Sequence, residues 1–228
     1  MTARQLALDL GHRPALGQSD FLISDSNADA VVWLDRWPDW PAGGLALWGP
    51  PGCGKSHLVN VWRARSGARL LTTDELTGAP QTLVEGGAAH FVLDCADVAL
   101  DETGERSLFH LYNLLREAGG TLMLAGRRPP ARWTIGLEDL RSRLLALPAV
   151  EVMAPDDDLI GGLLVKLFAD RQLAVDRPVI DYLAARMERS FETARHLVDA
   201  IDRDALARSR RITVPLVAEV LQGSVHKR

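Results

Sequence analysis

The segment Gly49-Pro-Pro-Gly-Cys-Gly-Lys-Ser56 fits the pattern G-x-x-x-x-G-K-[ST] at every fixed position. It follows the apolar run Leu45–Trp48, which predicts a buried strand, and it precedes a predicted helix over residues 54–65. In this context glycines let backbone N–H groups converge on phosphate oxygens at the start of the helix. The motif therefore predicts an α/β domain built around a nucleotide site.

Residue types within this loop suggest separate roles. Lys55 can bring a positive charge to the β- and γ-phosphates, and the Ser56 hydroxyl can ligate Mg²⁺. The predicted nucleotide-binding set from this segment is Gly49, Pro50, Pro51, Gly52, Cys53, Gly54, Lys55, Ser56 and His57.

A second acidic element stands at the end of the apolar run Phe91–Leu93. Asp94 in this position can hold the hydration shell of Mg²⁺, so we expect Ser56 and Asp94 to share the metal. The next residue, Cys95, is a poor base for activating water at neutral pH, which predicts weak intrinsic hydrolysis. Asp97 can replace it only if the turn brings its side chain back toward the site.

Apolar patterning divides the chain near residue 154. Before it, short apolar runs alternate with helical periods, which predicts a parallel sheet flanked by helices. After it only helical periods occur, over residues 156–172, 177–188, 191–208 and 213–222. We expect a flexible tail over residues 1–18, an α/β domain over 19–153 and a small all-helical domain over 154–228.

Composition excludes several classes of protein. The 228 residues are 47% hydrophobic and 25% charged, which is enough apolar material for a globular core. The net charge of −4 argues against binding nucleic acid through an overall excess of cations. Two cysteines make no disulfide framework, and neither a signal peptide nor a membrane span is apparent, so we expect a cytoplasmic protein.

The phosphate-binding loop, the strand ending in Asp94, an arginine on a short helix and a helical lid together resemble the AAA+ ATPases. Within that group the chain is similar to the replication initiator DnaA and to the short DnaA-related regulators of the Hda family, which lack the DNA-binding domain of DnaA. The segments that carry this resemblance are 21–28, 108–113, 124–130, 140–144 and 212–221.

The resemblance assigns roles to two arginines. Arg143 lies where the family has its arginine finger, which reaches ATP on a neighbouring subunit, and Arg195 matches the nucleotide sensor of the lid. It also implies ADP or ATP with Mg²⁺ as ligands. Two departures bear on catalysis: Cys95 replaces the acidic residue of DnaA, and Gly126-Arg127 replaces the small polar or acidic residue usual at the first sensor.

The tail contains the hexapeptide Gln5-Leu-Ala-Leu-Asp-Leu10, which resembles the peptide by which bacterial proteins bind the DNA polymerase sliding clamp. Gln5 can hydrogen-bond in a small polar site while Leu6, Leu8 and Leu10 fill an apolar groove. The simpler alternative interpretations are an edge strand with alternating apolar residues and a tail that packs on its own domain.

Together these features predict a regulator that binds adenine nucleotide, docks on the clamp and stimulates hydrolysis of DnaA-bound ATP. Its partners would be the clamp and DnaA, with homo-oligomers possible, no membrane contact, and DNA contacted mainly through the clamp. One alternative is a helicase-loader-type AAA+ ATPase that acts through its own ATP turnover. A small-metabolite kinase and an interaction module with an inactive nucleotide site are the others.

Overall fold

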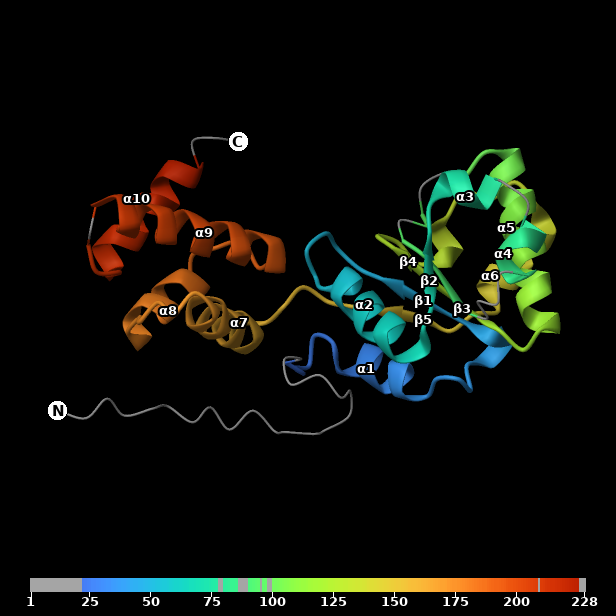
Figure 1. The fold of residues 1–228 in the computed structure, drawn as a ribbon, viewed down its shortest axis with the longest axis horizontal. Helices are drawn as coiled ribbons and strands as arrows, with labels where there is room; N and C mark the ends of the chain where they lie inside the picture. Colours follow the sequence, from blue (N-terminus) through green and yellow to red (C-terminus); the bar gives the residue numbers. More distant parts are fainter. Residues whose placement is uncertain are drawn as a thin grey trace.

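The computed structural model describes residues 22–77, 80–85, 90–94, 96–97, 100–208 and 210–225 (Figure 1). The hexapeptide of Gln5, Leu6, Leu8 and Leu10 lies outside these residues, and so does Cys95. The predicted tail over residues 1–18 is therefore untested by the structure.

Five strands form one sheet in the order β2-β3-β4-β1-β5. Every neighbouring pair is parallel, with Gly44 of β1 opposite Leu122 of β4. The central strand β4 is buried along its whole length, as its continuous apolar sequence predicts. The strands are β1 (Gly44–Trp48), β2 (Arg69–Leu71), β3 (His90–Leu93), β4 (Thr121–Gly126) and β5 (Ala149–Glu151).

Helices cover both faces of the sheet, which confirms the predicted α/β architecture. Leu34, Leu58 and Trp62 pack from one layer onto one face, in a core shared with Met123. Leu76, Leu108 and Leu140 pack from the other layer in a second core. The first layer is α1 (Ala28–Asp35) and α2 (Lys55–Ser66), and the second is α3 (Thr73–Thr77), α4 (Pro80–Glu85), α5 (Glu102–Glu117) and α6 (Glu138–Leu145).

The four helices after β5 form a helical lid with a core of its own. Phe168, Ile180 and Ile201 are buried there, on three different helices. The lid lies beside the sheet domain in Figure 1, joined to it by the segment after β5. Its helices are α7 (Asp157–Asp170), α8 (Arg177–Ala184), α9 (Phe191–Arg208) and α10 (Val214–Val225). Within the described ranges, no helix is both long and apolar enough to cross a membrane.

Two short helices were missed by the sequence patterns, and one helix begins earlier than they indicate. Helices α3 and α4 have five and six residues, too few to display a helical period. The apolar residues Leu108, Leu111 and Leu115 predict a helix over residues 107–117. Helix α5 instead begins at Glu102, where the Asp101 carboxylate caps it by accepting the Gly104 N–H at 2.7 Å.

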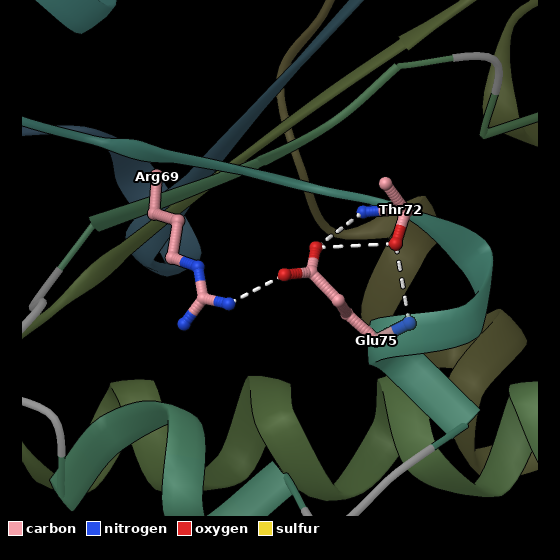
Figure 2. Close-up of polar contacts among 3 residues, drawn as sticks. All are labelled: Arg69, Thr72 and Glu75. Carbon is pink, nitrogen blue, oxygen red and sulfur yellow. Dashed lines mark hydrogen bonds and ion pairs between the residues drawn. The ribbon is translucent and has the colours of Figure 1, made fainter.

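Helix α3 is held by a reciprocal cap, drawn in Figure 2. The Thr72 hydroxyl accepts the Glu75 N–H at 3.2 Å, and the Glu75 carboxylate accepts the Thr72 N–H at 3.0 Å. The same carboxylate accepts from Arg69 at 2.5 Å. A helix of five residues is too short to be stable alone. Here side chains cap its start, and Leu76 packs in the second core.

The Thr72 backbone N–H, followed by the Arg69 and Thr72 side chains, lowers the pKa of Glu75 from its ordinary 4.5. A lowered folded-state pKa adds stability above 4.5, which is lost as the pH falls through the lowered pKa. We therefore expect Glu75→Gln to lower the urea midpoint at about pH 6 and to lower it less at about pH 3. An equal difference at both pH values would contradict this assignment.

Candidate nucleotide-binding site

The phosphate-binding loop, Gly49–Ser56, connects the end of β1 to the start of α2. Gly52 and Gly54 have φ values of 72° and 102°, in the left-handed region that favours glycine. The Lys55 ammonium turns back onto this loop, donating to the carbonyls of Gly49 at 2.8 Å and Pro50 at 2.9 Å. This cation therefore lies inside the loop that the motif predicts to receive phosphate.

The two predicted metal ligands come together across the ends of different elements. The Ser56 hydroxyl, at the start of α2, donates to an Asp94 carboxylate oxygen at 3.2 Å. Asp94 directly follows β3, so the parallel arrangement of β1 and β3 brings both residues to the same edge of the sheet. Hydroxyl and carboxylate oxygens suit Mg²⁺, so this donor pair fits the predicted ion.

The lid contacts the phosphate-binding loop directly at the start of α9. The Phe191 N–H donates to the Gly52 carbonyl at 3.0 Å. A β-carbon added at Gly52 would lie 2.3 Å from the Ser190 hydroxyl, and one at Gly54 would lie 3.1 Å from the Phe191 ring. The glycines therefore serve two purposes, loop conformation and close approach of the lid.

A cavity of about 250 Å³ lies between the sheet domain and the lid. Leucines from α2 and α7 give it apolar walls, and His57, Lys166 and Arg195 bring polar groups from three helices. An apolar chamber with a few basic groups beside a phosphate-binding loop fits a nucleotide. It is lined by Leu22, Asn27, Cys53, Gly54, His57, Leu58, Leu159, Leu163, Lys166, Leu167, Phe191 and Arg195.

Lys166 is the charged residue of the cavity wall that sequence reasoning missed. It follows Leu159 and Leu163 at positions i+7 and i+3 on α7, so the three side chains share one helix face. A lysine on an otherwise apolar helix face was the available signal, since the chain has only three lysines.

Arg143 lies apart from this cavity. It is exposed in the last turn of α6, the helix whose Leu140 and Leu144 pack in the second core. The cavity instead takes residues from α2, which belongs to the layer on the opposite face of the sheet. Among the described residues no carboxylate forms an ion pair with Arg143.

The Asp97 side chain lies against the first-sensor position, Gly126-Arg127. The Asp97 carboxylate accepts the Arg127 N–H at 2.9 Å, and a β-carbon added at Gly126 would lie 3.2 Å from Asp97. The turn after β3 thus brings Asp97 back to the end of β4. The structure pairs it with backbone there and does not place it on the cavity wall.

Comparison with known proteins agrees with this arrangement. Residues 162–221 match the family model described as the Hda lid domain. Domain III of the replication initiation protein DnaA from Thermotoga maritima superposes with a TM-score of 0.74 at 14% identity, covering 89% of this chain and 94% of that one. The chain has a DnaA-like AAA+ fold with an Hda-type lid.

Other solved structures share this DnaA-like fold. AMPPCP-bound DnaA from Aquifex aeolicus has a TM-score of 0.64 at 19% identity, covering 80% of this chain and 63% of that one. The Thermotoga maritima RuvB Holliday junction branch migration motor has a TM-score of 0.62 at 15% identity, with 79% and 61% covered. At such identities the likeness shows the AAA+ fold, and the Aquifex protein carries its AMPPCP on that fold.

Gly52→Ala should loosen the contact between lid and loop. The added β-carbon meets Ser190 and also forces alanine to φ near 72°, so we expect ADP affinity to fall about tenfold, measured by calorimetry. Gly67→Ala is the matched control, because Gly67 has φ 69° but nothing within 4 Å of an added β-carbon. An equal loss of affinity in both variants would show that backbone strain alone is responsible.

Proposed function

We propose that this protein is a negative regulator of DNA replication initiation that stimulates hydrolysis of the ATP bound to DnaA. Arg143 would act as an arginine finger in trans, and the protein's own adenine nucleotide would hold the lid and sheet domain together. The observation that carries the proposal is Arg143, which is exposed on a DnaA-like fold, lies apart from the cavity between sheet domain and lid, and forms no ion pair among the described residues.

The proposal gives the cavity an ADP or ATP with Mg²⁺. Lys55 would hold phosphate oxygens, Ser56 and Asp94 the ion, and Arg195 the phosphates from the lid side. Two observations support this assignment: the Ser56–Asp94 hydrogen bond and the presence of Arg195 in the cavity wall. The bound Mg²⁺ would supply charge neutralisation for the phosphates.

The finger assignment is supported by the surroundings of Arg143. A guanidinium that is not already paired with a carboxylate is available to stabilise charge on a phosphoryl group in transfer. Arg143 meets that condition among the described residues, and its helix is fixed by two buried leucines. The proposal places the ATP on DnaA, and a second copy of this chain is the other candidate acceptor.

The clamp contact is proposed from the hexapeptide alone. Gln5, Leu6, Leu8 and Leu10 would dock on the sliding clamp loaded on DNA, in the cytoplasm, so that contact with DNA is mainly indirect. We expect immobilised clamp to retain the parent chain and to lose Gln5→Ala/Leu6→Ala. Equal retention of both would remove the clamp from the proposal and leave the role of Arg143 to be tested separately.

A helicase-loader-type ATPase is a second candidate, favoured by the intact Ser56–Asp94 pair. Such a protein would hydrolyse ATP by itself at a substantial rate and would need no clamp. Steady-state ATP turnover by the isolated chain separates the two candidates. The regulator predicts weak turnover that rises little on adding DNA, whereas the loader predicts turnover near 1 s⁻¹ or above, in the range of roughly 1–10³ s⁻¹ typical of enzymes.

A further inference from the structure

Glu105 is the one charged side chain buried among the residues that the structure describes, with 6% of its surface exposed. It lies in the first turn of α5, where acidic residues usually face solvent. Burying a carboxylate is unfavourable unless strong hydrogen bonds replace water. The position of this acid therefore needs an explanation from its partners.

Its partners are backbone N–H groups at the start of α6. One carboxylate oxygen accepts from Gly136 at 2.9 Å, and the other accepts from Leu137 at 2.7 Å and from Gly136 at 3.1 Å. No described cation forms an ion pair with Glu105. Hydrogen bonds to an ionised acceptor are strong, and a negative charge is favoured at a helix N-terminus.

Helix α6 has no cap of its own at this end. Its N-cap residue is Leu137, whose side chain accepts no hydrogen bond. Glu105 reaches across from α5 and accepts the N–H of this N-cap residue, as the Glu of a capping box does from within its own helix. Leu140 and Leu144 are buried in the core that α5 also lines. The start of α6 and its inner face are thus both anchored to α5 and the sheet.

We propose that Glu105 is a positioning residue for Arg143. The inference rests on the proposed function, because it gives the buried carboxylate the task of fixing the helix that presents the finger. Arg143 follows Leu137 by six residues, about 9 Å along the helix axis. Because Arg143 lies in the last turn of the same eight-residue helix, a rotation or slip of that helix would displace its guanidinium.

Glu105→Ala should lower the stimulated rate of DnaA-bound ATP hydrolysis by about a hundredfold, the cost expected of a misplacement of about 1 Å. Glu105→Gln keeps an oxygen acceptor and should retain about a tenth of the parent rate. Glu102→Ala is the matched control, since Glu102 is an exposed acid on the same helix, paired with Arg106. It should keep the full rate, and ADP affinity should be unchanged in all three variants.

A double-mutant cycle separates positioning from a general structural role. If Glu105 acts through the finger, Glu105→Ala should lower the rate no further in an Arg143→Ala background. If the two substitutions lower the rate independently, so that their effects multiply in the double variant, the proposal is overturned. No finger operates if the parent chain fails to accelerate hydrolysis, or if Arg143→Ala accelerates it as much as the parent does. The proposed function then fails, and the positioning role falls with it.

Hydrogen exchange tests the anchor without DnaA. Amides 136–141 should exchange at least about tenfold faster in Glu105→Ala than in the parent, while amides of the lid are unchanged. If Glu105→Ala does not fold, Glu105→Gln carries the same comparison with a smaller expected change. Unchanged exchange at the start of α6 would refute the anchor, whatever the result with DnaA.

Discussion

Arg143→Ala should lower the rate of hydrolysis of DnaA-bound ATP, with clamp and DNA present, by at least about a hundredfold. The physical reason is that a guanidinium brought to the γ-phosphate in trans offsets charge that develops in the transition state. Single-turnover release of phosphate from preloaded DnaA measures this rate directly. Arg143→Lys keeps the charge but lacks the planar pair of donors, so it should recover only part of the rate.

Arg141→Ala is the matched control for this prediction. Arg141 is exposed on the same helix, two residues before Arg143, and forms no ion pair among the described residues. Its loss removes the same charge from the same helix but leaves the proposed finger intact, so the rate should stay within about threefold of the parent. If Arg143→Ala and Arg141→Ala behave alike, α6 contributes only general positive charge.

Lys55→Ala should lower ADP affinity by at least about a hundredfold, equivalent to about 2.7 kcal/mol. In the structure the ammonium donates to the Gly49 and Pro50 carbonyls, which places it within the loop where phosphate oxygens are expected. Removing it takes away the loop's own cation as well as those two hydrogen bonds. Calorimetry with ADP measures the affinity, and the rise in melting temperature produced by ADP gives a second readout.

Arg65→Ala provides the control for charge on α2. Arg65 lies at the other end of that helix and pairs with Asp35 at 3.2 Å, away from the phosphate-binding loop. ADP affinity should be unchanged in this variant, and a small loss of stability is the only expected effect. Full ADP binding by Lys55→Ala would show that the cavity does not use the loop as a phosphate site.

Much of the sheet domain could be predicted because its signals are local. Short apolar runs such as Leu45–Trp48 predict strands that are buried between two helical layers. The motif of the phosphate-binding loop predicts that a strand, the loop and a helix follow one another in that order. The sequence also predicts a short helix over Glu138–Leu145, and α6 has these bounds, with Leu140 and Leu144 on its inner face. The lid was predictable for the same reason, from the apolar stripe of α9.

The features that sequence reasoning missed depend on distant contacts. The sequence around Glu105 does not distinguish it from an ordinary surface acid near a helix start. Only the fold brings the Gly136 N–H to its carboxylate. Lys166 lies on α7 of the lid, and the cavity that it lines together with His57 of α2 forms only when the lid meets the sheet domain. The sequence leaves open whether the Asp97 side chain reaches the nucleotide site, because the turn after β3 decides where this side chain lies. That turn has no sequence pattern from which its conformation could be predicted.

The central claim is that this chain acts on ATP bound by another protein. The most direct measurement preloads DnaA with labelled ATP and adds the parent chain carrying unlabelled ADP. The formation of labelled ADP is then followed in the presence of DNA, with and without loaded clamp. The account predicts acceleration of about a hundredfold or more when chain, clamp and DNA are all present. An unchanged rate of labelled ADP formation on adding the chain would contradict it.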